Sequence, residues 1–122
     1  MATSAAFMAA LGLATSFLPQ EILAHLGTRA DAANTLILQI VGALWFGFAL
    51  LNWSARGNLI GGIYSRPIAL GNFVHFAMVS ITLIKLISAD AAPYLLVGTA
   101  CYALLAIGFG LVLFGGAPAQ KD

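Results

Sequence analysis

Residues 35–53 read TLILQIVGALWFGFALLNW, a stretch without a single charged side chain. A helix needs about 20 mostly apolar residues to cross the hydrocarbon core of a bilayer. Two later stretches are similarly apolar, and a shorter one stands at the amino terminus. Only 7% of the 122 residues are charged, whereas soluble domains carry about 25%. The sequence therefore predicts an integral membrane protein.

Four membrane-spanning helices are predicted, over residues 2–18, 35–53, 67–89 and 93–114. Pro67 and Pro93 open the third and fourth helices at a position that favours proline, and Pro19 ends the first. Because the links are short, we predict an all-α membrane fold, one transmembrane domain over residues 1–122, with the helices antiparallel in an up-down-up-down bundle. No Lys or Arg precedes the first apolar stretch, so we expect a retained helix and not a cleaved signal.

The link between the first two predicted helices, PQEILAHLGTRADAAN, has the features of a short helix. Pro19 can open a helical turn and Gly27 can close one. Glu21 and His25 are four residues apart and would share the polar side of that turn. We predict a helix over residues 19–27 that lies in the headgroup plane; an irregular loop with apolar residues is the alternative.

Positive charges are distributed almost evenly between the two sides of the predicted bundle. One side receives Arg56, Arg66 and Lys121, and the other receives Arg29 and Lys85. Since Lys and Arg are enriched in cytoplasmic loops, this count predicts that both termini are cytoplasmic. A difference of one charge also leaves open a dual topology, in which copies insert both ways. The expected location is the bacterial inner (plasma) membrane.

Polar side chains interrupt the second and third predicted helices. The stretch GNFVHFAMVS places Asn72 and His75 on one face of the third helix. The second helix, running the other way, ends with Asn52 and Arg56 on one face, which Trp45 extends inward. These five side chains form a polar pocket if the two faces meet. Polar residues inside a membrane usually face the bundle interior and are candidates for function.

Three roles are open for this pocket. The first is structural, with hydrogen bonds that hold the second helix against the third. The second is a ligand site in which Arg56 binds an anionic group above Asn72 and His75. The third is cofactor ligation by His75. Haem would need a second axial ligand, but His25 is expected on the opposite side of the membrane, and zinc would need several nearby ligands. We therefore expect no cofactor and no metal.

Other residues in the predicted helices have structural interpretations. Gln39 is expected to bond to a neighbouring backbone. Small side chains recur along the first and last helices, and small residues let membrane helices approach closely. The two stripes are predicted to pack together within one subunit; pairing across a homo-oligomer is the alternative. The stripes are Ala5, Ala9, Gly12 and Ser16, and Thr99, Ala103, Ala106 and Gly110.

Several classes of function lack their central residues in this chain. A net charge of +1 without a basic run argues against nucleic acid as a partner. The four acidic residues lie in links or in the tail, so a proton-coupled cation exporter would lack its membrane carboxylate. No serine, histidine and acid converge on one face, so an enzyme would need an acid–base pair such as His75 with Arg56 or with a substrate group, and a protein without enzymatic activity is favoured.

Three stretches carry a resemblance to a class of proteins: FLPQEILAHLG, GALWFGFALLNWSARG and RPIALGNFVHF. Through them the chain resembles small uncharacterised bacterial four-helix inner-membrane proteins. The resemblance implies the same fold and carries no catalytic assignment. Two hypotheses follow for function. One is a structural or accessory membrane protein that self-associates or joins a larger membrane complex. The other is a binding or transport module for a lipid-like, quinone-like or small anionic ligand.

Overall fold

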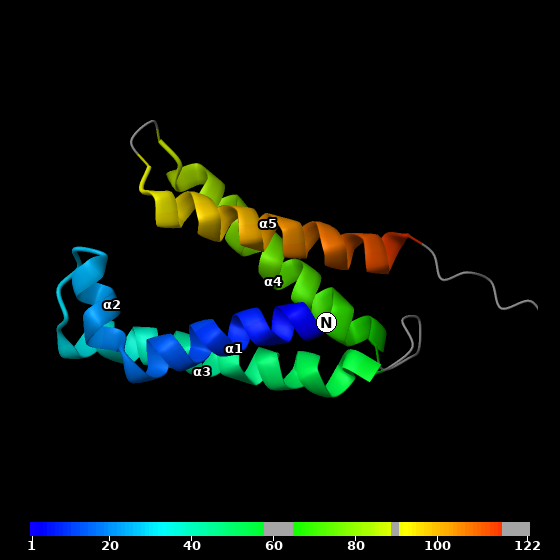
Figure 1. Ribbon diagram of the computed structural model, residues 1–122, viewed down its shortest axis with the longest axis horizontal. Coiled ribbons are helices and arrows are strands. Elements are labelled where there is room, and N and C mark those ends of the chain that lie inside the picture. Colours follow the sequence, from blue (N-terminus) through cyan, green and yellow to red (C-terminus); the bar gives the residue numbers. More distant parts are fainter. Residues whose placement is uncertain (58–64, 89–90, 116–122) are drawn as a thin grey trace, which may run out of the picture. The chain divides into compact units, whose positions relative to one another are not determined.

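The computed structural model describes residues 1–57, 65–88 and 91–115. Within these ranges every regular element is a helix, which confirms the all-α prediction (Figure 1). The elements are α1 (Ala2–Phe17), α2 (Pro19–His25), α3 (Ala32–Ser54), the short 3₁₀-helix η1 (Ala55–Gly57), α4 (Ser65–Leu86) and α5 (Pro93–Phe114). By length and composition α3 (continued by η1), α4 and α5 can each cross a membrane, and α1 with α2 makes a fourth crossing if the bent pair is one span.

The helix bounds follow the predictions closely, and the deviations have local causes. α5 begins and ends where predicted. α3 begins earlier, at Ala32, because the Asp31 carboxylate accepts a hydrogen bond of 2.8 Å from the backbone N–H of Asn34 and caps the helix. α4 begins at Ser65, which leaves Pro67 in the first turn, where a backbone N–H has no helical partner to lose. α4 ends at Leu86, and Ile87 and Ser88 are not helical, so the helix is shorter than predicted at this end; residue 89 itself lies outside the described residues.

The chain turns sharply between α1 and α2, whose axes are bent by 96°. Pro19 is the first residue of α2, and its missing N–H ends the hydrogen-bond ladder of α1. At the other end of α2, Gly27 has a φ of 67°, which is accessible to glycine without strain. The N–H of Thr28 donates to the carbonyl of Leu23 at 2.9 Å, which closes the helix with a Schellman motif.

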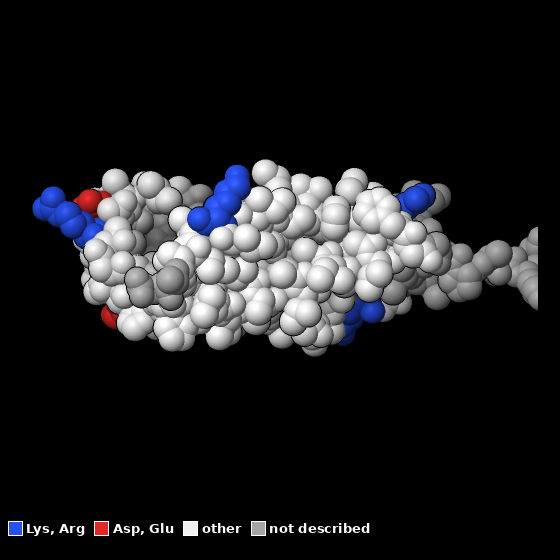
Figure 2. Space-filling view, turned by 90° about the horizontal axis from the view of Figure 1, so that it is seen from above, with Lys and Arg blue, Asp and Glu red and all other residues white. Residues whose placement is uncertain are grey.

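The exposed surface of the helices is apolar, and part of the buried interior is polar. Large side chains such as Leu44, Leu104 and Leu111 are each more than 60% exposed. The described buried polar residues are Ser4, Thr15, Asn52, Ser65, Asn72, Ser80 and Thr99. In the space-filling view, a few Lys, Arg, Asp and Glu side chains stand out from a face that is otherwise uncharged (Figure 2). Water would disfavour such a surface and hydrocarbon would not; the chain is a small helical membrane protein.

The chain divides into two compact units, Met1–Gly57 and Asn58–Asp122. In the first unit α1 packs along α3, and in the second α4 packs along α5. In each unit, later residues of one helix contact earlier residues of the other. The two helices of each unit therefore run in opposite directions. The single transmembrane domain and the four-helix bundle stay predictions.

Two glycines bring α1 and α3 into backbone contact. A Cβ placed on Gly12 would lie 2.8 Å from the carbonyl oxygen of Gly42 and 2.8 Å from the backbone nitrogen of Phe46. A Cβ on Gly42 would lie 2.5 Å from the Thr15 hydroxyl and 2.6 Å from the Ser16 hydroxyl. Gly12 and Ser16 therefore pack on α3. The predicted pairing of their stripe with α5 is wrong for these two residues, because the backbone of α3 fills the space beside them.

Aromatic rings hold α4 and α5 together. Phe76 of α4 is fully buried, with its ring centroid 5.8 Å from that of Phe109 and 5.4 Å from that of Tyr102. Nearer the end of α5, a Cβ on Gly110 would lie 3.2 Å from the Phe73 ring. Gly110 thus makes room for an aromatic ring of α4 within its own unit.

Candidate functional site

Asn52 is a fully buried amide in the first unit. Its exposed fraction is 0%, and its Nδ2 lies 3.8 Å from the Sδ of Met8, which is also fully buried. A thioether sulfur is a weak acceptor, so this is a weak polar contact between α3 and α1. The sequence predicted a structural hydrogen bond from this residue to the third helix. The contact found here connects the second predicted helix to the first.

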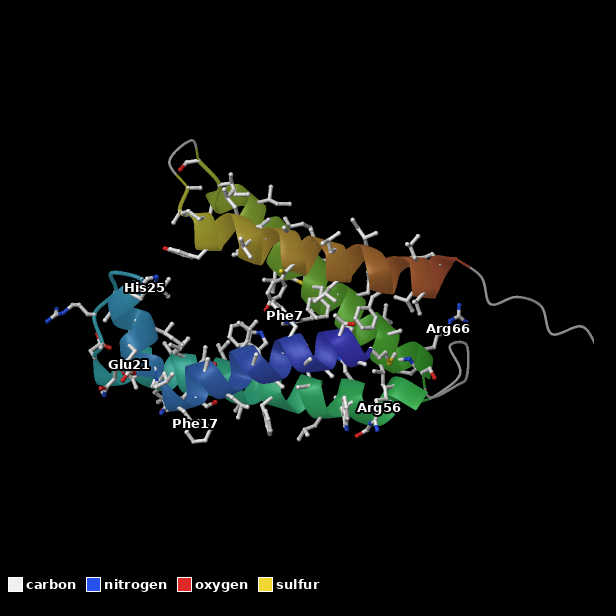
Figure 3. All side chains as sticks on the ribbon, in the orientation of Figure 1. Phe7, Phe17, Glu21, His25, Arg56 and Arg66 are labelled. Carbon is white, nitrogen blue, oxygen red and sulfur yellow. The ribbon has the colours of Figure 1, made fainter. Side chains whose placement is uncertain are left out.

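Arg56 lies at the end of α3, in η1, and is exposed (Figure 3). Its Nη1 donates to the carbonyl of Trp53 at 2.6 Å, and its guanidinium lies 3.9 Å from the centroid of the Trp53 ring. A cation is favourable at the carboxyl end of a helix, where carbonyl groups are left without donors. The guanidinium is therefore held against the last turn of its own helix.

Trp45 lies two turns before Asn52 on α3 and is half-buried. The spacing of seven residues puts the two side chains on the same face, as the sequence predicted. Ala49 lies between them and is 3% exposed, so this face continues into the interior of the unit.

Asn72 is buried on α4, with 1% of its surface exposed. Its Nδ2 donates to the carbonyl of Ile68, one turn earlier in the same helix, at 2.8 Å. The buried residues of α4 follow one face of the helix: Ser65, Ala69, Asn72, Phe76 and Ser80. The amide thus lies on the inner face and bonds to its own helix.

His75 is half-buried and lies among aromatic rings. Its ring centroid is 5.2 Å from that of Phe76 and 5.9 Å from that of Tyr102 on α5. Tyr102 was missed by the sequence reasoning, although a tyrosine in the middle of a membrane helix is a signal, because its hydroxyl needs a polar partner when buried. Its side chain is 4% exposed.

The five predicted site residues are divided between the two units. Asn52, Arg56 and Trp45 belong to the first unit, and Asn72 and His75 belong to the second. Within each unit the predicted neighbours share a helix, as the sequence requires. The common pocket of all five residues stays a prediction.

Gln39 bonds to a neighbouring backbone, as expected from the sequence. Its Nε2 lies 3.5 Å from the carbonyl oxygen of Ser16, in the last turn of α1. In the described ranges, no group of three or more His, Cys, Asp or Glu side chains lies together to hold a metal ion.

Comparison of the chain with models of protein families, with curated proteins and with solved structures finds no match in any of the three.

Proposed function

We propose that the chain is a structural or accessory component of a bacterial inner membrane, which self-associates or joins a larger membrane complex. It crosses the bilayer four times as an antiparallel up-down-up-down bundle, with both termini in the cytoplasm. The observation that carries this proposal is the use of the buried polar side chains. Four of them, Thr15, Asn72, Ser80 and Thr99, donate to a carbonyl one turn back in their own helix.

This pattern recurs in both units. The hydroxyl of Thr15 donates to the carbonyl of Leu11 at 2.8 Å, and that of Ser80 donates to the carbonyl of Phe76 at 2.7 Å. Thr99 and Asn72 make the same kind of bond one turn back along α5 and α4. Such bonds satisfy polar groups inside a membrane without a ligand. Because these polar side chains bond within their own helices, they support a role for the chain in packing against other helices.

A second candidate function is a binding or transport module for a lipid-like, quinone-like or small anionic ligand. The observation that favours it is the half-buried His75 beside the ring of Tyr102. An ionisable side chain within a membrane helix is a functional candidate by default, and aromatic rings suit a flat ligand. In this candidate the pocket would also include Asn52, Arg56, Asn72 and Trp45.

One purification separates the two candidates. The full chain is extracted from its own membrane in a mild detergent, and its absorption spectrum and native mass are recorded. A colourless sample with the mass of a homo-oligomer, or of a complex with other proteins, supports the accessory role. A monomeric mass with a bound small molecule contradicts it.

Variants make the same distinction sharper. In the accessory role His75→Ala lowers the thermal stability of the assembly and changes no ligand content. In the binding role His75→Ala and Arg56→Ala both remove the co-purified molecule, while the helix content measured by circular dichroism is unchanged. Arg66→Ala is a control, since it removes an exposed arginine outside the predicted pocket.

A further inference from the structure

The first helix is short for a membrane crossing. α1 has 16 residues, which rise about 24 Å at about 1.5 Å each, whereas the hydrocarbon core is about 30 Å thick. Its partner α3 has 23 residues. Because the two helices lie side by side, the longer α3 extends beyond α1.

The contact between Gln39 and Ser16 shows where along α3 the first helix ends. The last turn of α1 lies beside Gln39, and α3 begins at Ala32. These seven residues of α3 correspond to about 10 Å along its axis. The turn between α1 and α2 is therefore about 10 Å short of the start of α3.

The stretch of α3 beyond the end of α1 is apolar on its exposed side. Leu36 and Ile37 are 57% and 60% exposed, and Ile40, next to Gln39, is 52% exposed. Apolar side chains of this size face hydrocarbon in a membrane-spanning helix. The turn between α1 and α2 thus lies at a level where α3 still faces acyl chains.

The turn itself also exposes apolar side chains. Phe17 is 77% exposed, Leu18 is 50% exposed and Leu26 is 47% exposed. Phe17 stands at the turn, and Glu21 and His25 lie farther along α2 (Figure 3). Pro19 and Leu23 are buried within the unit, whereas Gln20 and Glu21 are exposed. α2 is therefore amphipathic, and the exposed apolar side chains of Leu18 and Leu26 stand at its two ends.

We propose that the α1–α2 turn, residues 17–26, is an interaction surface for the acyl chains of one leaflet. α2 lies in the membrane plane, at the depth of about 5–10 Å that is typical of interfacial helices. α1 crosses a bilayer that is locally thinned beside it. Thinning around a short hydrophobic helix is a normal response of lipid to such a mismatch.

Gln39 has a defined role in this arrangement. Pro19 has no N–H, so the end of α1 leaves carbonyl groups without their helical donors. Such groups are costly within hydrocarbon. The side-chain amide of Gln39 provides a donor for the carbonyl of Ser16 at this depth. This explains why a polar side chain stands in an otherwise apolar part of α3. The inference rests on the four-crossing topology proposed above.

Spin labels on single cysteines test the depth of the turn. In a Cys101→Ser background, which removes the one native cysteine, Leu18→Cys and Leu26→Cys are labelled in phosphatidylcholine vesicles. Leu13→Cys is the membrane control and Gln20→Cys is the polar-face control. We expect labels at 18 and 26 to collide with oxygen several-fold more than with a water-soluble nickel complex, as at 13, and the label at 20 to show the reverse.

Two results would overturn the proposal. Labels at 18 and 26 as accessible to nickel as the label at 20 would place the turn in water. Labels accessible to neither reagent would show that protein, not lipid, covers the turn. Gln39→Leu tests the role of the amide: it should shift the label at 18 towards nickel, whereas Thr82→Val in α4 should not. An unchanged ratio in Gln39→Leu would rule out that role.

Discussion

The two units of this protein hold their helix pairs together by different means. In the first unit, glycines let the backbones of α1 and α3 touch at Gly12 and Gly42. In the second unit, rings fill the space between α4 and α5, with Phe76 stacked on Phe109. In lipid there is no hydrophobic gain from burying one apolar helix against another, so association depends on packing and hydrogen bonds. Both units obtain close packing, one from the smallest side chains and the other from the largest.

This difference has a consequence for tolerance to mutation. Where two backbones are in contact, neither has a flexible part that can move aside for an added side chain. When a ring is removed, in contrast, it leaves a cavity that neighbouring side chains can partly fill. We therefore expect the first unit to lose most stability when a side chain is added between α1 and α3. The second unit should lose a smaller amount when a ring between α4 and α5 is removed.

The largest expected effect is that of Gly12→Leu. A Cβ at this position already meets the backbone of Gly42 and Phe46 at 2.8 Å, so the helices must separate. We expect the free energy of unfolding to fall by about 3 kcal/mol, the upper end of the usual cost of overpacking. Unfolding in mixed micelles with increasing dodecyl sulfate, followed by circular dichroism, measures the change.

Gly47→Leu is the matched control in the same unit. No described atom beyond the helix's own backbone lies within 4 Å of a Cβ on Gly47, and leucine has a better helix propensity than glycine. This variant should be as stable as the wild type or more so. Gly42→Ala should fall between the two, because its Cβ would meet two side-chain hydroxyl groups at 2.5 and 2.6 Å, which can move aside, and the backbone carbonyl oxygen of Gly12 at the longer distance of 3.0 Å. Equal stability of Gly12→Leu and Gly47→Leu would contradict the glycine contact.

The second expected effect is that of Phe76→Ala in the other unit. The ring of Phe76 pairs with those of Phe109 and Tyr102, and an aromatic pair contributes about 0.5–1.5 kcal/mol. We expect a loss of about 2 kcal/mol in the same unfolding measurement. Leu104→Ala on α5 is the control, because Leu104 is 69% exposed and should cost almost nothing. A loss in Phe76→Ala no larger than in Leu104→Ala would show that the rings do not hold this unit together.

Helix positions could be predicted well from this sequence, because apolar stretches mark the extent of the long helices and prolines mark where helices begin. α5 follows Pro93 as predicted, and the bend at Pro19 and the close at Gly27 were both visible. The early start of α3 was missed because the cap at Asp31 lies outside the apolar stretch. Such a cap depends on one hydrogen bond from a side chain to the backbone, and a hydropathy pattern does not reveal it.

Helix partners could not be predicted in the same way. The small residues of the first helix were recognised, but Gly42, which completes their contact, stands alone in an apolar run and formed no stripe. The face that Trp45 and Asn52 share on α3, and the one that Asn72 and His75 share on α4, were predictable, because a spacing of seven or three residues fixes a face. Their partners were not: Met8 and Tyr102 come from helices that spacing within α3 or α4 cannot identify.

A smaller effect on stability is expected for the contact between the Asn52 amide and the Met8 sulfur in the first unit. Hydrogen bonds between membrane helices contribute about 0.6 kcal/mol on average, and sulfur is a weak acceptor. In a double-mutant cycle with Asn52→Ala and Met8→Leu, we expect a coupling free energy of about 0.5 kcal/mol or less. A coupling well above 1 kcal/mol would mean that this contact, and not the glycine pair, determines the packing of α1 on α3.

The smallest expected effect is that of Arg56→Lys at the end of α3. Lysine keeps the charge but loses the planar group that both stacks on Trp53 and bonds to its carbonyl. A cation–π pair at an exposed site contributes about 0.5–1 kcal/mol, and a lysine ammonium can keep part of it, so we expect a loss of only about 0.3 kcal/mol and a shift in tryptophan fluorescence. Arg66→Lys, at the start of α4, should change neither quantity. If Arg56→Lys instead left stability unchanged and abolished binding of a co-purified anionic molecule, then Arg56 would serve a ligand in the predicted pocket and not the end of its own helix.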